Sequence, residues 1–285
     1  VLPELEWFLQ AKVPQVKFVD RTFNCKKSHA MAIWQYIRDH DNGVTNFHFE
    51  IAADLLDKDE LDLLSTMRPG LVQLEIGVQS TNEKTLEAIR RKTDIEEIRE
   101  ITETINSWHN IHQHLDLIAG LPWEDLESFK KSFNDVYEME PEQLQLGFLK
   151  ILKGSYMEEL IPDCDLLYSA APPYEVLQTK WLSYGDVLEL KDIEEMTEVH
   201  YNSRQFTCTL KELEKEFDTP YEMFSFMAGY YNKNHLFGIS HSRIARYEIL
   251  WKIIQERLEK NGKCETQGKP ENGGVSEKLE QYRDL

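Results

Sequence analysis

Polar side chains that could bind a ligand recur along the apolar runs in the first half of the chain. Successive residues of a strand point to opposite sides of a sheet, so residues two apart share a face. Burying charged groups without partners is costly, so such recurrence indicates a ligand, a metal ion or a tight polar network. In three of the runs, polar residues lie on one face by this rule: His48 with Glu50, Glu75 with Gly77 and Gln79, and His112 with His114 and Asp116. A fourth run, the first in the chain, ends at the polar residue Asp20.

Two interpretations of these residues need nothing beyond their chemistry. His48, Glu50, His114 and Asp116 could bind a divalent metal ion in an aldolase-like barrel, because imidazole and carboxylate groups suit such ions. Alternatively, the polar groups are hydrogen-bonded structural residues of a non-catalytic scaffold that binds a protein partner. The residues alone leave both open.

The elements that position these residues follow a strand–helix alternation. Runs rich in apolar, β-branched and aromatic residues cover 15–19, 46–51, 71–78, 112–118 and 143–151. Apolar residues spaced three and four apart predict helices over 28–38, 58–65, 83–91, 95–108 and 126–138. This repetition indicates a parallel sheet in an α/β fold, here a partial (β/α) TIM-like barrel. Such a barrel builds its site at the carboxyl ends of its strands, where the polar groups above are found.

The alternation stops near residue 160, and a mainly helical region is predicted to follow. Pro162, Pro172 and Pro173 interrupt the chain there. Helices are predicted over 174–182, 191–206, 209–217, 220–232 and 240–258. We therefore expect a barrel fragment over 1–160, a helical accessory domain over 161–260 and a disordered or frayed tail over 261–285.

Composition narrows the classes of partner. The formal net charge of −19 disfavours nucleic acid, because binders of a phosphate backbone need a basic surface. No run approaches the roughly 18 to 20 apolar residues of a membrane span, so we expect a cytoplasmic protein that binds no membrane. The cysteines are too scattered for a disulfide scaffold or a metal knuckle, which predicts reduced thiols at Cys25, Cys164, Cys208 and Cys264.

Three segments together resemble the radical S-adenosylmethionine superfamily, in particular the branch of anaerobic coproporphyrinogen oxidases, methylthiotransferases and cobalamin-dependent enzymes. Phe18-Val19-Asp20-Arg21-Thr22-Phe23 is similar to the second-strand signature of that branch, and Leu74-Glu75-Ile76-Gly77-Val78-Gln79-Ser80 is similar to its Gly-Val-Gln-Ser segment. Asp116-Leu117-Ile118-Ala119-Gly120-Leu121-Pro122-Trp123-Glu124-Asp125 is similar to its Asp-Leu-Ile-x-Gly-Leu-Pro-Gly-Glu-Thr stretch. The chain departs from these patterns at Arg21, Trp123 and Asp125.

The resemblance implies where S-adenosylmethionine would bind. Glu50 matches a glutamate near the amino group of the ligand, and Arg91 matches a residue that pairs with its carboxylate. Gln79 and Asp116 match groups that bond the ribose. Gly120, in the Gly-Leu-Pro turn, is a further candidate because a glycine lets the backbone approach a ligand closely. Leu149 is another, because the segment that it begins and Ser155 ends resembles the turn near the adenine. No catalytic residue and no metal ligand is assigned in this chain.

The resemblance also implies cofactors that this chain alone cannot hold. The superfamily binds a four-iron four-sulfur cluster through Cys-x-x-x-Cys-x-x-Cys, a motif that is absent here, so we expect it upstream of Val1. Residues 161–260 resemble the accessory domain of a cobalamin-binding subgroup, which implies a cobalamin domain upstream as well. The full-length protein is expected to cleave S-adenosylmethionine reductively to a 5′-deoxyadenosyl radical, as an oxidoreductase or methyltransferase acting on a small molecule. The fragment by itself is expected to be inactive.

Overall fold

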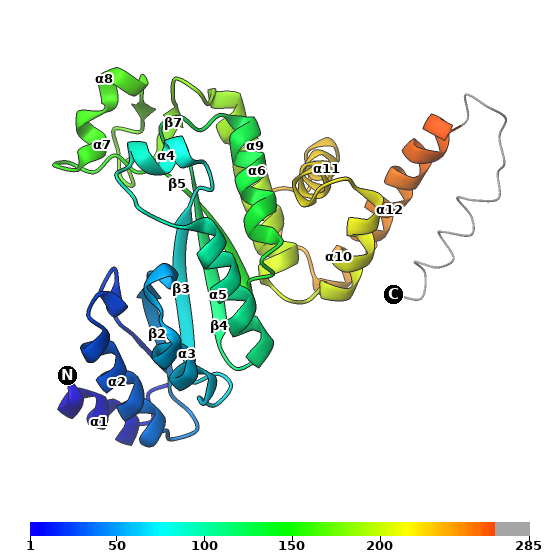
Figure 1. Ribbon diagram of the computed structural model, residues 1–285. Coiled ribbons are helices and arrows are strands. Elements are labelled where there is room, and N and C mark those ends of the chain that lie inside the picture. The colour runs from blue at the N-terminus through cyan, green and yellow to red at the C-terminus, as the bar shows by residue number, and fades with distance from the viewer. Residues whose placement is uncertain (266–285) are drawn as a thin grey trace. The chain divides into compact units, whose positions relative to one another are not determined.

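The computed structural model describes residues 1–265, which divide into two compact units (Figure 1). The first unit is Val1–Val187, and the second begins at Leu188. The sequence predicts a domain boundary between residues 160 and 161. In the structure the boundary lies after Val187, so residues 161–187 belong to the first unit. Among the described residues, no helix combines the length and the apolar content that a membrane crossing requires.

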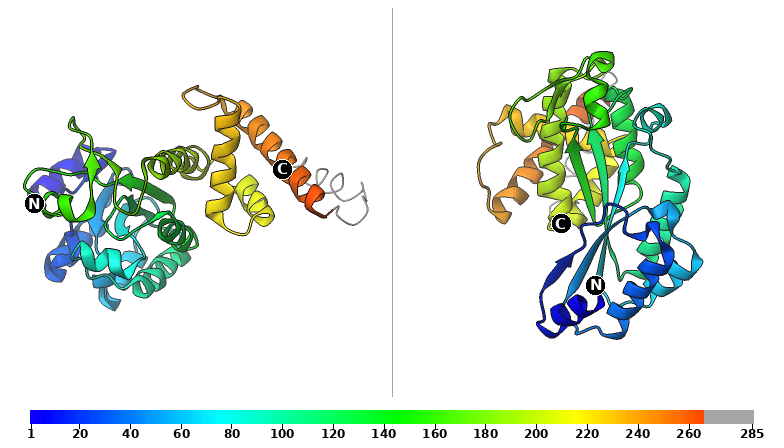
Figure 2. Two further views of the ribbon diagram at one scale, coloured as in Figure 1. Left: turned by 90° about the horizontal axis from the view of Figure 1, so that it is seen from above. Right: turned by 90° about the vertical axis from the view of Figure 1, so that its left-hand side faces the viewer.

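The first unit is built on a five-stranded sheet in which neighbouring strands are parallel and follow chain order. This arrangement confirms the predicted α/β fold with a partial TIM-like barrel. Figure 2 shows the strands fanning out with helices along one face. The strands are β1 (Gln15–Lys17), β2 (Asn46–Ile51), β3 (Val72–Gln79), β4 (His112–Ala119) and β5 (Gln143–Phe148).

The helices of this unit bury their apolar sides and begin at capping residues. Asp57 forms a capping box with Glu60, and Asp94 and Asp125 each accept a hydrogen bond from a backbone amide of the first turn. These caps satisfy amides that the helix itself leaves without acceptors. The helices are α1 (Leu2–Gln10), α2 (Lys27–Asp39), α3 (Lys58–Ser65), α4 (Glu83–Ala88), α5 (Ile95–Trp108) and α6 (Leu126–Tyr137), with short 3-10 turns at Phe23–Cys25 and Ala53–Leu55.

The core of the first unit lies between the sheet and these helices. Alternate residues of the strands, such as Phe47, Phe49 and Leu74, are fully buried. Ile105 of α5 and Phe133 of α6 are equally buried and come from the helical side. The alternation leaves the opposite face of each strand to the polar residues, so the core fixes which way those side chains point.

Residues 149–187 form the last part of the first unit and contain most of a second apolar cluster. Leu149 and Ile151 pack there with Cys164, Leu166 and Val176. The elements of this segment are α7 (Tyr156–Glu159), α8 (Ile161–Cys164) and an antiparallel pair of strands, β6 (Leu167–Tyr168) and β7 (Val176–Gln178). The predicted helix over 174–182 is therefore wrong. Within this range, the backbone amide of Val176 instead donates to the Leu149 carbonyl at 2.8 Å, and this tertiary pairing overrides the local helical pattern.

The second unit is helical, as predicted. Its elements are α9 (Tyr184–Met196, which begins within the first unit), a π-helix (Thr197–Asn202), α10 (Thr207–Leu213), a 3-10 turn (Glu214–Glu216), α11 (Pro220–Lys233) and α12 (Arg243–Glu265). His200 of the π-helix is fully buried, and its Nε2 lies 3.0 Å from the hydroxyl of Tyr231. Of the predicted tail, residues 261–265 continue α12, and the rest lies outside the described residues.

Candidate S-adenosylmethionine site

Strand register brings the polar residues of the sheet into adjacent rows. Glu50 of β2 is paired with Glu75 of β3, and Glu75 is paired with His114 of β4. One row further along, Gly77 is paired with Asp116. Neighbouring strands of a sheet lie about 4.8 Å apart, so side chains in one row on one face are within reach of each other. Alternation along each strand predicts the shared face, and the register shows which residues on that face are neighbours.

Glu75 joins two basic residues from the other strands. Its Oε2 accepts hydrogen bonds from Lys17 Nζ at 3.0 Å and from His48 Nε2 at 2.8 Å. Burial favours a higher pKa for Glu75, but the hydrogen bond and charge of Lys17, with smaller contributions from His114 and His48, lower the pKa overall. Burial, followed by the charge of Lys17, lowers the pKa of His48. His48 is therefore a neutral donor to an ionised Glu75 at neutral pH.

Glu50, Asp116 and Arg91 share one electrostatic environment. Burial raises the pKa of the Glu50 carboxyl group, and the charges of Glu75 and Asp116 raise it further. Burial lowers the pKa of the Arg91 guanidinium, whereas Asp54, Glu50 and Asp116 act in the opposite direction. The guanidinium donates to the Gly77 carbonyl and, at 3.0 Å, to the hydroxyl of Thr93. A half-buried cation thus faces several carboxylates at the carboxyl ends of the strands.

Gln79 folds back over Gly77 at the end of β3. Its φ of 71° is left-handed, and the pairing of β3 with β4 is irregular between Gly77 and Gln79. A Cβ atom at position 77 would lie 2.5 Å from Gln79 Nε2 and 3.5 Å from Arg91 Nη2. The absence of a side chain at Gly77 lets Gln79 and Arg91 approach the same point. These two predicted site residues are therefore brought together with Glu50 and Asp116.

Gly120 and Leu149 lie in a different environment from these four residues. Gly120 has a φ of 85°, and a Cβ atom there would lie 2.6 Å from Val176 Cγ1. The Leu149 amide donates to the Ala119 carbonyl at 2.9 Å, and its side chain is buried in the apolar cluster of Cys164 and Val176. Both positions therefore contact the apolar cluster rather than the polar rows.

The divalent-metal interpretation finds no support in the geometry. His48 is engaged by Glu75 rather than by Glu50, and His114 Nε2 lies 3.0 Å from Asp116 Oδ1. Within the part of the chain that the structure describes, no group of three or more His, Cys, Asp or Glu side chains is placed to hold a metal ion.

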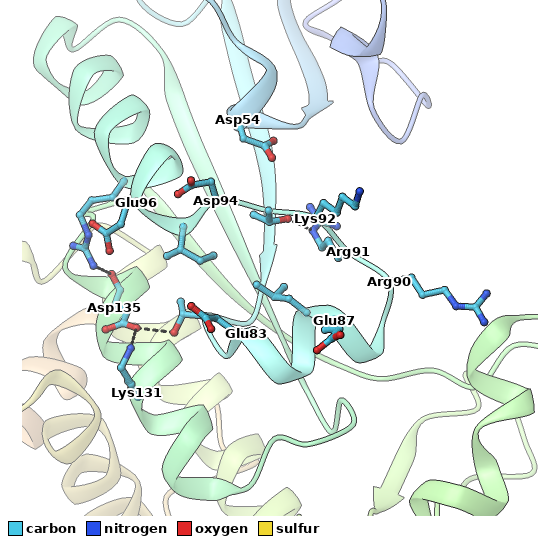
Figure 3. Close-up of a pocket in the computed structure, with 15 residues that line it drawn as sticks. Asp54, Glu83, Glu87, Arg90, Arg91, Lys92, Asp94, Glu96, Lys131 and Asp135 are labelled. Atoms are coloured by element: carbon cyan, nitrogen blue, oxygen red, sulfur yellow. Dashed lines mark hydrogen bonds and ion pairs between the residues drawn. The ribbon is translucent and has the colours of Figure 1, made fainter.

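A hollow adjoins the polar rows and is lined by charged residues of both signs. It measures about 1000 Å³ and lies between α4, the loop that follows it, α5 and α6. Asp54 and Arg91 lie at one side of it, and Lys131 with Asp135 at the other (Figure 3). Arg91 is the one predicted site residue among those that line it. The hollow therefore reaches the candidate site only at the Arg91 end.

The residues of the polar rows fit S-adenosylmethionine chemically. The ligand has a cationic sulfonium and amino group, a carboxylate and ribose hydroxyls, for which Glu50, Arg91 and Asp116 offer complementary charges and an acceptor. Asp116 Oδ1 and His114 Nε2 are buried atoms without a hydrogen-bond partner, despite their 3.0 Å separation. Buried polar atoms in this state are rare in native proteins and are satisfied by a ligand or water in most cases.

Two family models match different parts of the chain. Residues 2–136 match the radical SAM superfamily, and residues 163–277 match a family described as protein of unknown function (DUF4080). The oxygen-independent coproporphyrinogen III oxidase of Salmonella typhimurium is 32% identical over 140 residues, which cover 47% of this chain and 30% of that protein. The corresponding enzyme of Pseudomonas aeruginosa is 28% identical over 140 residues, covering 49% of this chain and 30% of the enzyme. The chain thus spans 30% of the length of these relatives.

A solved structure shows the same fold. The radical S-adenosylmethionine methyltransferase TsrM from Kitasatospora setae, with its tryptophan substrate and a SAM analogue bound, aligns with a TM-score of 0.52 at 16% identity. The alignment covers 61% of this chain and 36% of TsrM. This likeness extends to the fold alone. Residues 2–136 are thus similar in sequence to the radical SAM superfamily, and the chain shares its fold with this solved structure.

Proposed function

We propose that this chain supplies the strand-end half of an S-adenosylmethionine site in a radical SAM enzyme. The observation that carries the proposal is the clustering of Glu50, Arg91 and Asp116 at the strand ends. Arg91 donates to the carbonyl of Gly77, which is paired with Asp116, and Glu50 lies in the adjacent row opposite Glu75. Asp116 Oδ1 has His114 Nε2 as an ion-pair contact at 3.0 Å but accepts no hydrogen bond in the structure. A zwitterionic ligand with hydroxyl groups would supply what the cluster lacks.

Each residue has a defined task in this proposal. Glu50 stabilises the amino group of the ligand, and Arg91 pairs with its carboxylate. Asp116 accepts a hydrogen bond from a ribose hydroxyl group, and the side-chain amide of Gln79 forms a second hydrogen bond with the ribose. Leu149 and Gly120 form an apolar wall for the adenine, in line with their contacts with the cluster around Val176. These contacts orient the ligand and exclude water, which is the part of the reaction that the protein contributes.

The remaining components are proposed for the full-length protein. Bound to a reduced four-iron four-sulfur cluster, S-adenosylmethionine supplies a 5′-deoxyadenosyl radical. The cysteines that hold the cluster would come from chain preceding Val1. Cobalamin is proposed as a further cofactor on a domain of its own, with a small molecule rather than a nucleic acid as the substrate. TsrM, whose solved structure with cobalamin and a [4Fe-4S] cluster shares the fold, motivates the cobalamin proposal.

The proposal has a direct test. The reading frame preceding Val1, over roughly the 200 residues of a typical domain, is inspected for the cysteine triad. The full-length protein is then reconstituted anaerobically with iron and sulfide, reduced and incubated with S-adenosylmethionine. Formation of 5′-deoxyadenosine supports the proposal. A reconstituted protein that carries its cluster but forms no 5′-deoxyadenosine contradicts it.

A further inference from the structure

Glu124 is a buried carboxylate close to the proposed site, and the contacts proposed for the ligand do not involve it. Its side chain is 1% exposed. Its Oε1 accepts hydrogen bonds from Ser80 Oγ at 2.6 Å and Ser132 Oγ at 3.2 Å, while Oε2 is buried without a partner. Three segments therefore meet at one oxygen: the loop after β3, the loop after β4 and α6.

The carboxylate sets the direction of the two hydroxyl groups. Because Ser80 and Ser132 donate to Glu124, their oxygen lone pairs remain free to accept. Ser80 Oγ accepts from the Asn82 amide at 3.0 Å, and Ser132 Oγ accepts from the Thr81 amide at 3.0 Å. Glu124 thus determines, through two serines, the position of the backbone at residues 81 and 82.

A second set of hydrogen bonds links the same two loops, and here the donor is a side chain of the loop after β3. Asn82 Nδ2 donates to the Trp123 carbonyl at 3.0 Å and to Ser128 Oγ at 2.8 Å. Trp123, immediately before Glu124, has a left-handed φ of 63°. A left-handed conformation costs a non-glycine residue roughly 1 to 2 kcal/mol, so the loop needs such bonds to hold its shape.

These loops continue directly into proposed ligand contacts. Gln79, with its φ of 71°, immediately precedes Ser80, and Gly120 lies four residues before Glu124. Loss of the hydrogen bond from Ser80 to Glu124 would remove a constraint on the left-handed backbone of Gln79, and therefore on the position of the Gln79 side-chain amide. Glu124 is thus placed to control the geometry of the ribose contact without touching the ligand.

We infer that Glu124 is a positioning residue of the S-adenosylmethionine site: it holds the loops after β3 and β4 in register through Ser80 and Ser132, so that Gln79 and Asp116 present their polar groups to one ribose. This inference rests on the proposed function of the site. It assigns to Glu124 an acceptor role, for which one oxygen atom at the position of Oε1 is sufficient.

The chain offers a matched control in Glu60. This glutamate is also 1% exposed, also has one carboxylate oxygen without a hydrogen bond, and also has its pKa raised by burial. Its other oxygen caps α3 by accepting from the Asp57 amide at 3.1 Å. Glu60 therefore reproduces the burial of Glu124 without any bond to the loops that follow β3 and β4.

The experiment is an anaerobic calorimetric titration of the full-length, cluster-reconstituted protein with S-adenosylmethionine. Glu124→Ala is expected to weaken binding by about tenfold or more, because small misplacements of contact groups have effects of this size. Glu124→Gln retains an acceptor oxygen and is expected to bind within about threefold of the wild type. Glu60→Ala is expected to lose stability but to bind as the wild type does. Ser80→Ala, which removes the bond with little change in volume, is expected to weaken binding in the same direction as Glu124→Ala.

The outcomes separate the inference from the proposed function. If the wild type binds and both Glu124→Ala and Ser80→Ala bind equally well, the inference is wrong while the proposed function stands. If Glu60→Ala weakens binding as much as Glu124→Ala, loss of stability explains the effect and the inference is again wrong. If the wild type itself shows no saturable binding, the proposed function fails and the inference with it. Hydrogen exchange provides a readout without ligand: the amides of Thr81 and Asn82 should exchange faster in Glu124→Ala than in Glu124→Gln, and equal rates would contradict the inference.

Discussion

His48 Nε2 lies 2.8 Å from Glu75 Oε2, although the two residues are 27 positions apart and belong to different strands. The same oxygen lies 3.0 Å from Lys17 Nζ, so one carboxylate connects β1, β2 and β3. Hydrogen bonds to a charged group contribute more than neutral ones, about 1.5 to 3 kcal/mol. The bond from Lys17 contributes less than this, because its side chain is 55% exposed and solvent screens the interaction. Glu75 therefore links three strands in the row that also contains Glu50.

Glu75→Gln should destabilise the protein. The substitution removes the charge that both donors face, and we expect the free energy of unfolding to fall by about 1 to 2 kcal/mol. Urea denaturation followed by circular dichroism measures this difference. Asp62→Asn is the control, because the Lys58–Asp62 pair is exposed, with side-chain exposures of 84% and 65%. Exposed pairs contribute little, so this variant should stay within about 0.5 kcal/mol of the wild type. Equal losses in both variants would refute the role assigned to Glu75.

Gly120→Ala should be more harmful than Gly154→Ala. Both glycines have a left-handed φ, at 85° and 75°, so both variants acquire backbone strain of about 1 kcal/mol. At position 120 the new Cβ would also lie 2.6 Å from Val176 Cγ1, whereas nothing lies within 4 Å of position 154. Overpacking typically adds about 1 to 3 kcal/mol. Thermal or urea unfolding should therefore separate the variants by at least about 1 kcal/mol, and Val176→Ala should partly rescue Gly120→Ala. Indistinguishable variants would contradict the packing described around Val176.

Glu124 should make stability fall as the pH rises. Burial raises the pKa of its carboxyl group from 4.5 to about 7, and the hydrogen bonds from Ser80 and Ser132 only partly oppose this shift. Between those values the folded state binds more protons than the unfolded state, so its stability decreases with increasing pH. The loss approaches about 1.4 kcal/mol per pH unit at most. Measured from pH 5 to pH 8, the stability of wild type relative to Glu124→Gln should decline. A constant difference between the two proteins would show that Glu124 has an ordinary pKa.

His200 should have the opposite effect, with stability lost as the pH falls. Burial, assisted by the charge of Arg246, lowers the pKa of this imidazole from 6.5 to about 3. The unfolded state therefore binds more protons between these values, and acidification destabilises the second unit by up to about 1.4 kcal/mol per pH unit. Titrating the unfolding midpoint from pH 7 to pH 4 should show a steeper acid loss in the wild type than in His200→Gln. The exposed His235 supplies the control, since His235→Asn should leave the acid loss unchanged. The same slope in the wild type and His200→Gln would exclude a buried neutral His200.

Periodicity predicted most of the first unit because its elements are locally determined. The strand at 46–51 and the helices at 58–65 and 95–108 have the predicted bounds. Buried apolar residues mark all three elements, and a capping aspartate also marks the start of each helix. Residues 161–187 were harder to place. Their partners, such as Leu149 for Val176, come from the end of the barrel, and neither residue signals that pairing locally.

The candidate site was predictable as a face of the sheet but not as a network. Alternation along β2, β3 and β4 identified Glu50, Gln79 and Asp116 by their parity, and the family resemblance added Arg91. Glu75 has the same parity, yet its role depends on strand register, which brings Lys17 from 58 positions away. Glu124 lies in a loop, where parity has no meaning. The family pattern includes a glutamate at this position, but only the structure shows its burial against Ser80 and Ser132.

Titration of the reconstituted full-length protein with S-adenosylmethionine, comparing Arg91→Gln with Arg90→Gln, tests the central claim most directly. Arg91 is half-buried and faces Glu50 and Asp116, whereas its exposed neighbour Arg90 lies over the ring of Tyr156, with 3.6 Å from Cζ to the ring centroid. If Arg91 pairs with the ligand carboxylate, Arg91→Gln should weaken binding by about tenfold or more, the scale of a lost charge-assisted hydrogen bond, and Arg90→Gln should bind as the wild type does. Wild-type affinity in Arg91→Gln would contradict the account.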